Sequence, residues 1–333
     1  MKIAFFGTNK EEQAILSELI TGTENHFFAE GFTNEHLEEI KDLDILCTFV
    51  GSQITSQVMD LFPNLKLIAT RSTGFDHIDV AYAKEKGVVV TNVPAYGANT
   101  VAEFTFALIM ALSRGAHNAY SHLKAGTFKD PQDFRGFDLF GKTLGVVGTG
   151  KIGQNVIKIG KGFGMKIEAF DVYPNEAFAK EQGFNYSALA EVLKRADIVT
   201  LHVPYNEGTH HLINQGNIGN LKQGAYIINT ARGEVLETEA LLMALKSGQA
   251  AGAGLDVLEG EKEMQESYDL FLGRERRAVN YKLLLENHLL LDLENVIVTP
   301  HVAFCTEEAE RRILEVTAEN ILNFVKGEKV NSV

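Results

Sequence analysis

The stretch that most constrains the fold is Thr143–Asp171, TLGVVGTGKIGQNVIKIGKGFGMKIEAFD. Its first apolar run predicts a buried strand, which is followed by a glycine turn and a helical segment. A second apolar strand then ends on Asp171. A glycine pattern alone would be weak evidence, but the two strands and the acid strengthen it. The order of strand, glycine turn, helix, strand and acid predicts a βαβ unit that binds a dinucleotide.

Each part of this unit has a physical role. Gly148 permits the tight turn, Gly150 leaves room for the pyrophosphate, and Gly153 lets the helix pack closely on the strand. The helix N-terminus offers free N–H groups and a positive dipole to the phosphates. Asp171 can accept hydrogen bonds from ribose hydroxyls and would repel a 2′-phosphate, and Val172–Asn175 contains no arginine or lysine to compensate it. The sequence therefore predicts NAD as the cofactor.

The composition excludes several classes of function. The chain has 333 residues, 45% hydrophobic and 23% charged, enough for two globular domains. Its net charge of −13 argues against nucleic acid and anionic membrane surfaces as partners. The apolar start is too short for a signal peptide, and no apolar stretch is long enough to cross a membrane. Cys47 and Cys305 form neither a metal-binding spacing nor a disulfide framework, so we expect a cytoplasmic protein without a metal site.

Alternating apolar and helical segments predict two α/β domains, each with a parallel sheet. In the second domain, six strands would complete a doubly wound dinucleotide fold. The predicted strands are Lys2–Phe6, His26–Glu30, Ile45–Val50, Lys66–Thr70 and Val88–Thr91, then Thr143–Val147, Lys166–Phe170, Ile198–His202, Ala225–Asn229, Gly254–Val257 and Val296–Thr299.

Three further segments carry helical patterns. Apolar residues at helical spacing predict one long helix over Ala98–Lys124 that links the domains, and Glu307–Val325 is predicted to be an amphipathic helix. The long connection Lys262–Asp292 is predicted to hold two helical pieces, around Tyr268–Phe271 and over Tyr281–Leu291.

Reactive side chains follow three of the later strands. Arg232 follows the strand Ala225–Asn229, Asp256 lies at the end of the next one with Glu261 after it, and His301 follows the last. Ligands in such folds bind beyond the carboxyl ends of the strands. Arginine can hold a carboxylate through two parallel hydrogen bonds, while histidine exchanges a proton at neutral pH and a carboxylate stabilises its charged form. Together with a nicotinamide, such a set can interconvert a 2-oxo acid and a 2-hydroxy acid.

Segments over most of the chain resemble the D-isomer-specific 2-hydroxyacid dehydrogenases, most closely the D-lactate dehydrogenase branch. The resemblance is specific because the segments keep the family's order. They are Arg71–Asp79, Asn92–Tyr96, Thr100–Glu103, the βαβ unit Thr143–Asp171, Leu201–Pro204, Asn229–Gly233, Gly254–Glu261 and Thr299–Phe304. The resemblance implies an α/β chain in which a Rossmann-type doubly wound parallel sheet, residues 98–302, binds NAD. This domain would be inserted into a flavodoxin-like substrate-binding domain of residues 1–97, completed by 303–333.

The resemblance also implies the catalytic residues. Arg232 would bind the carboxylate and keto oxygen of the substrate, His301 would be the acid/base, and Glu261 would be the partner of His301. Glu259 and Glu263 lie close to Glu261 in sequence, so the choice of partner acid stays open. Taken alone, Arg232 could also be a surface ion-pair residue and His301 could merely cap a loop.

Binding residues follow from the same resemblance. Those expected at the cofactor are Gly148, Gly150, Lys151, Ile152, Gly153 and Asp171 at the pyrophosphate and ribose, Val203, Pro204 and Thr209 on the adenosine side, and Thr230, Ala231 and Asp256 near the nicotinamide. Those expected at the substrate are the backbone of Thr73 and Gly74 together with Arg232, Phe49, Tyr96 and Phe304. Tyr96 and Phe304 could equally be packing aromatics, and His77, His202, His210 and His211 are expected to serve structure.

The resulting prediction is an NAD-dependent enzyme that reduces a small 2-oxo acid to the D-2-hydroxy acid, with pyruvate to D-lactate as the leading reaction. A bulkier apolar 2-oxo acid, glyoxylate or hydroxypyruvate are alternatives. Formate is disfavoured because formate dehydrogenases of this superfamily carry glutamine in place of Glu261. A non-enzymatic alternative is an NAD-sensing regulator resembling the corepressors of this fold. The family also implies a homodimer, for which the helix from Ala98 would suit the interface.

Overall fold

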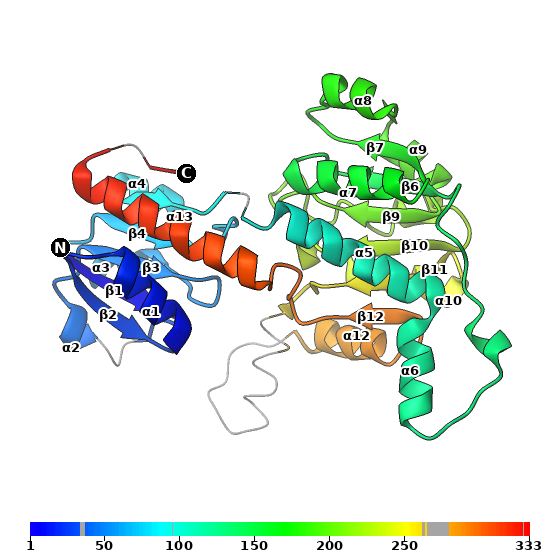
Figure 1. The fold of residues 1–333 in the computed structure, drawn as a ribbon, viewed down its shortest axis with the longest axis horizontal. Helices are drawn as coiled ribbons and strands as arrows, with labels where there is room; N and C mark the ends of the chain where they lie inside the picture. The colour runs from blue at the N-terminus through cyan, green and yellow to red at the C-terminus, as the bar shows by residue number, and fades with distance from the viewer. Residues whose placement is uncertain (34–36, 95, 262–263, 265–279, 329) are drawn as a thin grey trace. The chain divides into compact units, whose positions relative to one another are not determined.

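Two parallel sheets organise the chain, one in each of two units. The computed structural model describes residues 1–33, 37–94, 96–261, 264, 280–328 and 330–333. One unit consists of Met1–Tyr96 with Cys305–Val333, and the other of Gly97–Phe304 (Figure 1). The first unit is therefore built from both ends of the chain. The binding roles predicted for the two parts stay predictions.

The first unit holds a five-stranded parallel sheet in the order β2-β1-β3-β4-β5. This is the flavodoxin-like order, so the predicted fold of this part is confirmed. The strands are β1 Lys2–Phe6, β2 Glu24–Phe28, β3 Ile45–Thr48, β4 Leu67–Thr70 and β5 Val89–Thr91. The helices are α1 Lys10–Leu19, α2 Leu37–Ile40, α3 Ser56–Asp60, α4 Val80–Glu85 and α13 Glu307–Lys326.

Both faces of this sheet are buried. Successive residues of a strand point to opposite faces, and they pack in different clusters here. Ile3 and Phe5 of β1 pack in one cluster with Leu314 and Ile321 of α13, whereas Phe6 belongs to a separate cluster with side chains of β3 and β4. Each fully buried side chain of this size contributes about 1.5–3 kcal/mol. The apolar face of α13 therefore joins the C-terminal segment to the N-terminal sheet.

The second unit holds a seven-stranded parallel sheet in the order β12-β11-β10-β9-β6-β7-β8. Helices α5, α7 and α8 contribute to the core on one face, and α9, α10 and α12 to the core on the other, as in a doubly wound fold. The strands are β6 Thr143–Val147, β7 Lys166–Phe170, β8 Asn185–Tyr186, β9 Ile198–Leu201, β10 Ala225–Asn229, β11 Ala250–Leu255 and β12 Val296–Val298. The helices are α5 Ala98–Arg114, α6 Ala116–Lys124, α7 Lys151–Gly162, α8 Glu176–Gln182, α9 Leu189–Arg195, α10 Thr238–Ser247 and α12 Tyr281–Leu291.

The single helix predicted over Ala98–Lys124 is wrong, because α5 and α6 are separate helices. Gly115 between them has φ +58, and its N–H caps α5 by donating to the carbonyl oxygen of Leu112. Glycine adopts this left-handed conformation without the steric cost of a side chain. Moreover, α5 packs on α7, β10 and β11 within the second unit.

The sequence predicts six strands in this unit, and the structure adds a seventh, β8, at the edge beside β7. Two residues are too few to give a periodic signal. Strand ends also differ: β11 spans Ala250–Leu255 instead of Gly254–Val257, and β2 begins at Glu24 instead of His26 because Glu24 pairs with Lys2 of β1. The predicted helix over Tyr281–Leu291 is confirmed as α12, whereas the piece around Tyr268–Phe271 lies outside the described residues.

Among the described residues, no helix combines the length and the apolar character needed to cross a membrane.

The first unit buries a charged side chain, Arg71, at the carboxyl end of β4. Its Nη1 donates to Oε1 of Glu12 at 2.7 Å, and its Nη2 donates to the carbonyl oxygens of Phe6 and Gly7. The ring of Phe49 lies 5.5 Å from the guanidinium carbon. The other carboxylate oxygen of Glu12 accepts from the backbone N–H of the α1 N-cap residue. One carboxylate thus holds both the start of α1 and a buried cation beneath the strand ends.

Replacing Glu12 by glutamine should lower the free energy of unfolding by about 3 kcal/mol, because it leaves a buried guanidinium without its counter-charge. The measurement is urea unfolding followed by circular dichroism. Glu11, an exposed residue of the same helical turn, provides the matched control, and Glu11→Gln should cost less than about 0.5 kcal/mol. Equal losses in the two variants would contradict this account of Arg71.

Candidate active site

The glycine turn after β6 has the geometry that a dinucleotide requires. Gly148 has φ +93, and a Cβ there would lie 2.7 Å from the carbonyl carbon and oxygen of His202. A Cβ on Gly153 would lie 2.1 Å from the carbonyl oxygen of Gly148. Real Cβ atoms do not approach backbone this closely, so both positions require glycine. The first glycine makes the turn, and the second brings α7 against the strand.

Gly150 differs from the other two because space around it is open. It is the N-cap of α7, no side chain caps the helix there, and a Cβ would meet nothing within 4 Å. The exposed Lys151 and partly buried Ile152 begin the helix. An uncapped helix N-terminus with an open approach suits a phosphate group. These residues therefore fit the pyrophosphate of a dinucleotide.

Asp171 lies beside this turn, at the end of β7. Its Oδ2 accepts from the backbone N–H of Thr149 at 2.6 Å and from the hydroxyl of Thr149 at 2.9 Å, and its Oδ1 accepts from the N–H of Tyr173 at 2.8 Å. The structure thus brings the predicted ribose-binding acid to the predicted phosphate-binding turn. Thr149 and its neighbours in this network were not among the predicted site residues.

The loop after β9 carries the residues predicted for the adenosine side. Thr209 donates from its hydroxyl to the carbonyl oxygen of Pro204 at 2.7 Å and accepts from the N–H of Asn206 at 2.8 Å, which closes the loop. The side chain of Val203 lies against Gly148, since a Cβ on that glycine would meet it at 2.9 Å. The loop therefore borders the glycine turn at Val203, and its adenosine contacts stay a prediction.

His202 joins this loop to the turn. Its N–H donates to the carbonyl oxygen of Val147 at 2.7 Å, and its Nε2 lies 2.9 Å from the hydroxyl of Thr200. The residue is partly exposed as a whole, but Nδ1 is buried and has no hydrogen-bond partner in the part of the chain that the structure describes. Burial lowers the pKa of His202 to about 3. It is therefore a neutral structural histidine.

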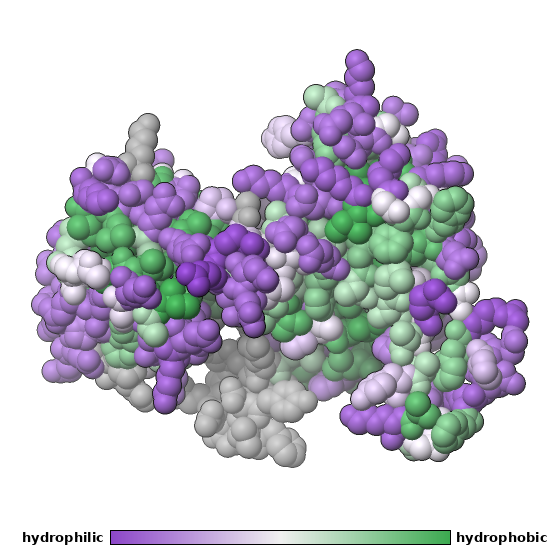
Figure 2. Space-filling model, viewed as in Figure 1, coloured by the Kyte–Doolittle hydropathy of each residue, from purple (hydrophilic) through white to green (hydrophobic). Residues whose placement is uncertain are grey.

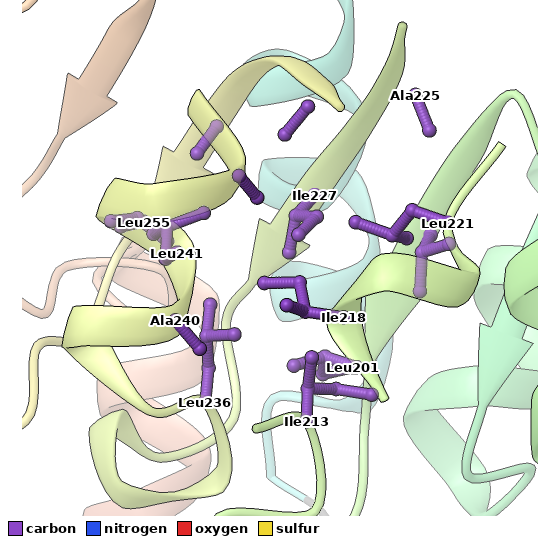
Figure 3. Close-up of a cluster of buried hydrophobic side chains, with 14 of the residues drawn as sticks. Leu201, Ile213, Ile218, Leu221, Ala225, Ile227, Leu236, Ala240, Leu241 and Leu255 are labelled. Atoms are coloured by element: carbon purple, nitrogen blue, oxygen red, sulfur yellow. The ribbon is translucent and has the colours of Figure 1, made fainter. Parts of the chain in front are cut away.

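Arg232 follows β10 in a turn closed by Asn229. The Nδ2 of Asn229 donates to the carbonyl oxygen of Arg232 at 2.8 Å, and its Oδ1 accepts from the N–H of Ala231 at 3.0 Å. A Cβ on Gly233 would lie 2.0 Å from the carbonyl carbon of Leu258, so only glycine lets this turn pack on the chain after β11. The turn leads into α10, and Figure 3 shows a buried apolar cluster that includes side chains of β9, β10 and α10. The backbone that carries Arg232 is therefore held by the Asn229 side chain and by the packing of Gly233 on Leu258.

Thr230, predicted near the nicotinamide, is 7% exposed. Its hydroxyl lies 3.0 Å from that of Thr105 on α5. This contact fixes the turn before Arg232 from its other side.

His301 and Glu261 form a pair. Nδ1 of His301 lies 3.1 Å from Oε2 of Glu261, whose Oε1 accepts from the N–H of Leu258 at 2.8 Å. Both side chains are about one-third exposed, at 36% and 35%. The ring of Phe304 lies edge-on to His301 with centroids 6.4 Å apart. Glu261 thus orients the imidazole through one nitrogen, while the ring stays accessible.

A buried carboxylate shapes the turn that carries His301. Asp256 is 1% exposed and accepts from the hydroxyl of Thr299 at 2.6 Å and from the N–H groups of Val302 and Ala303 at 2.9 and 2.8 Å. Burial raises its pKa, and these three donors oppose that effect. The N–H of His301, whose φ is +53, donates to the carbonyl oxygen of Asp256. The predicted contact of Asp256 with the cofactor remains a prediction.

Glu259 and Glu261, two candidate partners of His301, contact different groups. Glu259 accepts from His211 at 2.8 Å and from the hydroxyl and N–H of Thr238 at 3.0 and 3.2 Å, so its carboxylate binds structural groups. Glu263 lies outside the described residues. Glu261 is the acid whose contact with His301 is observed.

The substrate residues predicted in the first unit lie on segments that follow β3, β4 and β5. Thr73 donates from its hydroxyl to the carbonyl oxygen of Val93 at 2.8 Å, and the hydroxyl of Ser72 donates to the carbonyl oxygen of Gly74 at 2.6 Å. Phe49 contacts Arg71, as described above. The carbonyl oxygen of Tyr96 accepts from Nε of Arg312 at 2.7 Å. These contacts lie within the protein, so the substrate-binding roles predicted for Thr73, Gly74, Phe49 and Tyr96 stay predictions.

Arg232, Glu261 and His301 follow β10, β11 and β12, which are adjacent parallel strands. Their carboxyl ends therefore meet at one edge of the sheet. Within the described ranges, no group of three or more histidine, cysteine, aspartate or glutamate side chains could hold a metal ion.

Comparison with known proteins gives a family and close relatives. Residues 106–303 match the family described as D-isomer specific 2-hydroxyacid dehydrogenase, NAD binding domain. A glyoxylate reductase of Korarchaeum cryptofilum is 38% identical over 295 residues, which cover 88% of this chain and 82% of that protein. A D-lactate dehydrogenase of Escherichia coli is 34% identical over 332 residues, 98% of each chain.

Solved structures give the same result. The crystal structure of D-lactate dehydrogenase from Aquifex aeolicus, complexed with NAD and lactic acid, superposes with a TM-score of 0.88 at 38% identity. The match covers 98% of this chain and 96% of that one.

The lowered pKa of His202 makes a prediction about stability and pH. Histidine in the unfolded chain has a pKa of about 6.5. As the pH falls below that value, the unfolded state binds a proton that folded His202, with its lowered pKa, does not bind. Between pH 6.5 and 5 this should remove roughly 1.5 kcal/mol from the free energy of unfolding. His202→Gln should lack that part of the loss, as measured by urea unfolding at each pH. The exposed His288 on α12 is the control, and parallel pH curves for wild type and His202→Gln would contradict the assignment.

Proposed function

Since the chain belongs to the D-isomer specific 2-hydroxyacid dehydrogenases, we propose that it uses NADH to reduce pyruvate to D-lactate. The observation that carries this proposal is the His301–Glu261 pair, 3.1 Å between Nδ1 and Oε2, at the sheet edge that also presents Arg232. An acid/base and a cation at the carboxyl ends of adjacent strands meet the needs of 2-oxo acid reduction.

In this proposal His301 supplies the proton. The contact of Nδ1 with Glu261 leaves Nε2 to donate to the keto oxygen. NADH supplies the hydride that reaches the keto carbon. Glu261 stabilises the charged imidazolium before transfer and fixes its orientation. Proton and hydride together convert the oxo acid to the hydroxy acid, and His301 regains its proton from solvent.

Arg232 performs the second task, which is binding. Its guanidinium would hold the carboxylate of the substrate through two parallel hydrogen bonds and draw charge from the keto oxygen. The Asn229 turn that closes on Arg232 keeps its backbone in place for this purpose. We further propose that the backbone at Thr73 and Gly74 receives the carboxylate, with Phe49, Tyr96 and Phe304 as apolar pocket residues.

The same proposal assigns the remaining cofactor contacts. The turn of Gly148, Gly150 and Gly153, with Lys151 and Ile152, would hold the pyrophosphate, and Asp171 would hold the ribose. Val203, Pro204 and Thr209 would lie at the adenosine, and Thr230, Ala231 and Asp256 at the nicotinamide.

Pyruvate is favoured because the similarity to a D-lactate dehydrogenase extends over nearly the whole of both chains. Glyoxylate is a second candidate, because a glyoxylate reductase shares slightly higher identity over a shorter alignment.

A homodimer in the cytoplasm completes the proposal. Figure 2 shows apolar residues gathered over α5 on the visible face. Phe140 and Phe163, close to the end of α5, are 82% and 40% exposed. A second copy of the chain would cover such a surface. Sedimentation at twice the monomer mass of 36.7 kDa is the expected observation.

A substrate panel tests the proposed activity. NADH oxidation is followed by absorbance. We expect the highest kcat/KM with pyruvate and lower values with glyoxylate, hydroxypyruvate and 2-oxoisocaproate. The product should be oxidised by a D-specific but not by an L-specific lactate dehydrogenase. A higher kcat/KM for glyoxylate would replace pyruvate by the second candidate. Absence of turnover with every oxo acid, despite NADH binding, would favour the NAD-sensing alternative.

Replacing His301 by glutamine should lower kcat by about 10²–10⁴-fold, because the general acid is lost. NADH affinity, measured by calorimetry, should stay within twofold of wild type. His288→Gln, which changes an exposed histidine of α12, should leave turnover unchanged. Full turnover in the His301→Gln variant would remove this residue from the mechanism.

A further inference from the structure

Asp171 is the end of a chain of hydrogen bonds that runs through two hydroxyl groups. The hydroxyl of Thr149 lies 2.9 Å from Oδ2 of Asp171, the hydroxyl of Tyr186 lies 2.8 Å from that of Thr149, and the N–H of Asn175 lies 3.1 Å from the hydroxyl of Tyr186. Thr149, Tyr186 and Asn175 have no role in the chemistry described above. All of them belong to the second unit.

The direction of every bond in this chain is fixed by its two ends. A backbone N–H can only donate, and a carboxylate can only accept. Asn175 therefore donates to Tyr186, Tyr186 donates to Thr149, and Thr149 donates its one proton to Asp171. Hydrogen bonds aligned in this way polarise one another, and the last one ends on a charged group, which makes it stronger.

The protein occupies most of the hydrogen-bond acceptor positions of the Asp171 carboxylate. Oδ2 of Asp171 accepts two hydrogen bonds from Thr149, and Oδ1 accepts one from the N–H of Tyr173. A carboxylate has about four acceptor positions. Three are filled by the protein, so Asp171 offers one fixed position to a ribose hydroxyl and cannot turn without breaking several bonds.

Tyr186 is itself anchored. It lies on β8, where it pairs with Ala169 of β7, and its ring meets that of Phe184 edge-on with centroids 5.4 Å apart. Thr149 is 3% exposed, and its carbonyl oxygen accepts from Nε2 of Gln154 at 3.1 Å. The edge strand β8 therefore places a phenol hydroxyl against the glycine turn.

We propose that Thr149 and Tyr186 are positioning residues for cofactor selectivity, which hold the Asp171 carboxylate where a 2′-phosphate would have to lie. An acid discriminates against NADP only if it stays in place, since a carboxylate free to rotate could turn away from the phosphate. The hydroxyl chain removes that freedom. Preference for NADH over NADPH is then a property of the Tyr186–Thr149–Asp171 network and not of the acid alone.

This inference rests on the nucleotide-binding turn and is independent of which oxo acid is reduced. Its test measures binding directly. Dissociation constants of the full chain for NADH and NADPH are obtained by titration calorimetry, and selectivity is the ratio of the NADPH to the NADH constant.

Tyr186→Phe removes only the hydroxyl, and Thr149→Val removes the hydroxyl that donates to Asp171 and accepts from Tyr186 while keeping the branched shape. Each should lower the selectivity ratio about fivefold, the change in an equilibrium constant that the net contribution of one ordinary hydrogen bond produces. Tyr226→Phe is the matched control, because Tyr226 is a partly buried tyrosine on β10 of the same sheet. Its ratio should equal that of wild type.

A double-mutant cycle separates positioning from general structural damage. In an Asp171→Ala background the network has nothing to hold, so adding Tyr186→Phe should change the ratio less than twofold. The proposal is overturned if both single variants keep the wild-type ratio. It is equally overturned if Tyr186→Phe shifts the ratio as much without Asp171 as with it. A change in turnover with pyruvate alone, at unaltered nucleotide selectivity, would belong to the proposed reaction and count against this inference.

Discussion

The proposed chemistry depends most on the hydrogen bonds that the buried carboxylate of Asp256 accepts. Taking an ionised group out of water is costly unless hydrogen bonds replace its hydration, and Asp256 receives three from the segment Thr299–Ala303. Those bonds hold His301 in a left-handed backbone conformation that a histidine seldom adopts. With the ring fixed in this way, Glu261 meets Nδ1. The proposed acid/base, His301, is thus placed by a side chain that need not touch the substrate.

Close backbone approaches give the same sheet edge its rigidity. Gly148 lies against His202, Gly153 against Gly148, and Gly233 against Leu258, each at a distance that excludes any side chain. Loops at a sheet edge are otherwise the most mobile part of an α/β fold. Here close backbone contacts restrain the glycine turn after β6 and the turn that carries Arg232.

Much of this could be predicted from the sequence, because the signals are local. The glycines around Gly150, the acid at Asp171 and the polar residues after β10 to β12 each sit at a fixed offset from an apolar strand. The break at Gly115 was missed because the apolar spacing continues across it. Tyr186 was missed because a two-residue edge strand has no period, and its hydroxyl meets Thr149 only through tertiary pairing. Likewise, His301 contacts Glu261 while Glu259 contacts His211, and two acids so close in sequence give no local signal that tells these partners apart.

The most direct test of the central claim is a crystal structure of the chain with NADH and oxamate, an unreactive analogue of pyruvate. The account predicts that the oxamate carboxylate makes two hydrogen bonds to the guanidinium of Arg232. It also predicts that the adjacent carbonyl oxygen lies within hydrogen-bonding distance of Nε2 of His301. Oxamate bound away from these two side chains, with NADH in place on the glycine turn, would contradict it.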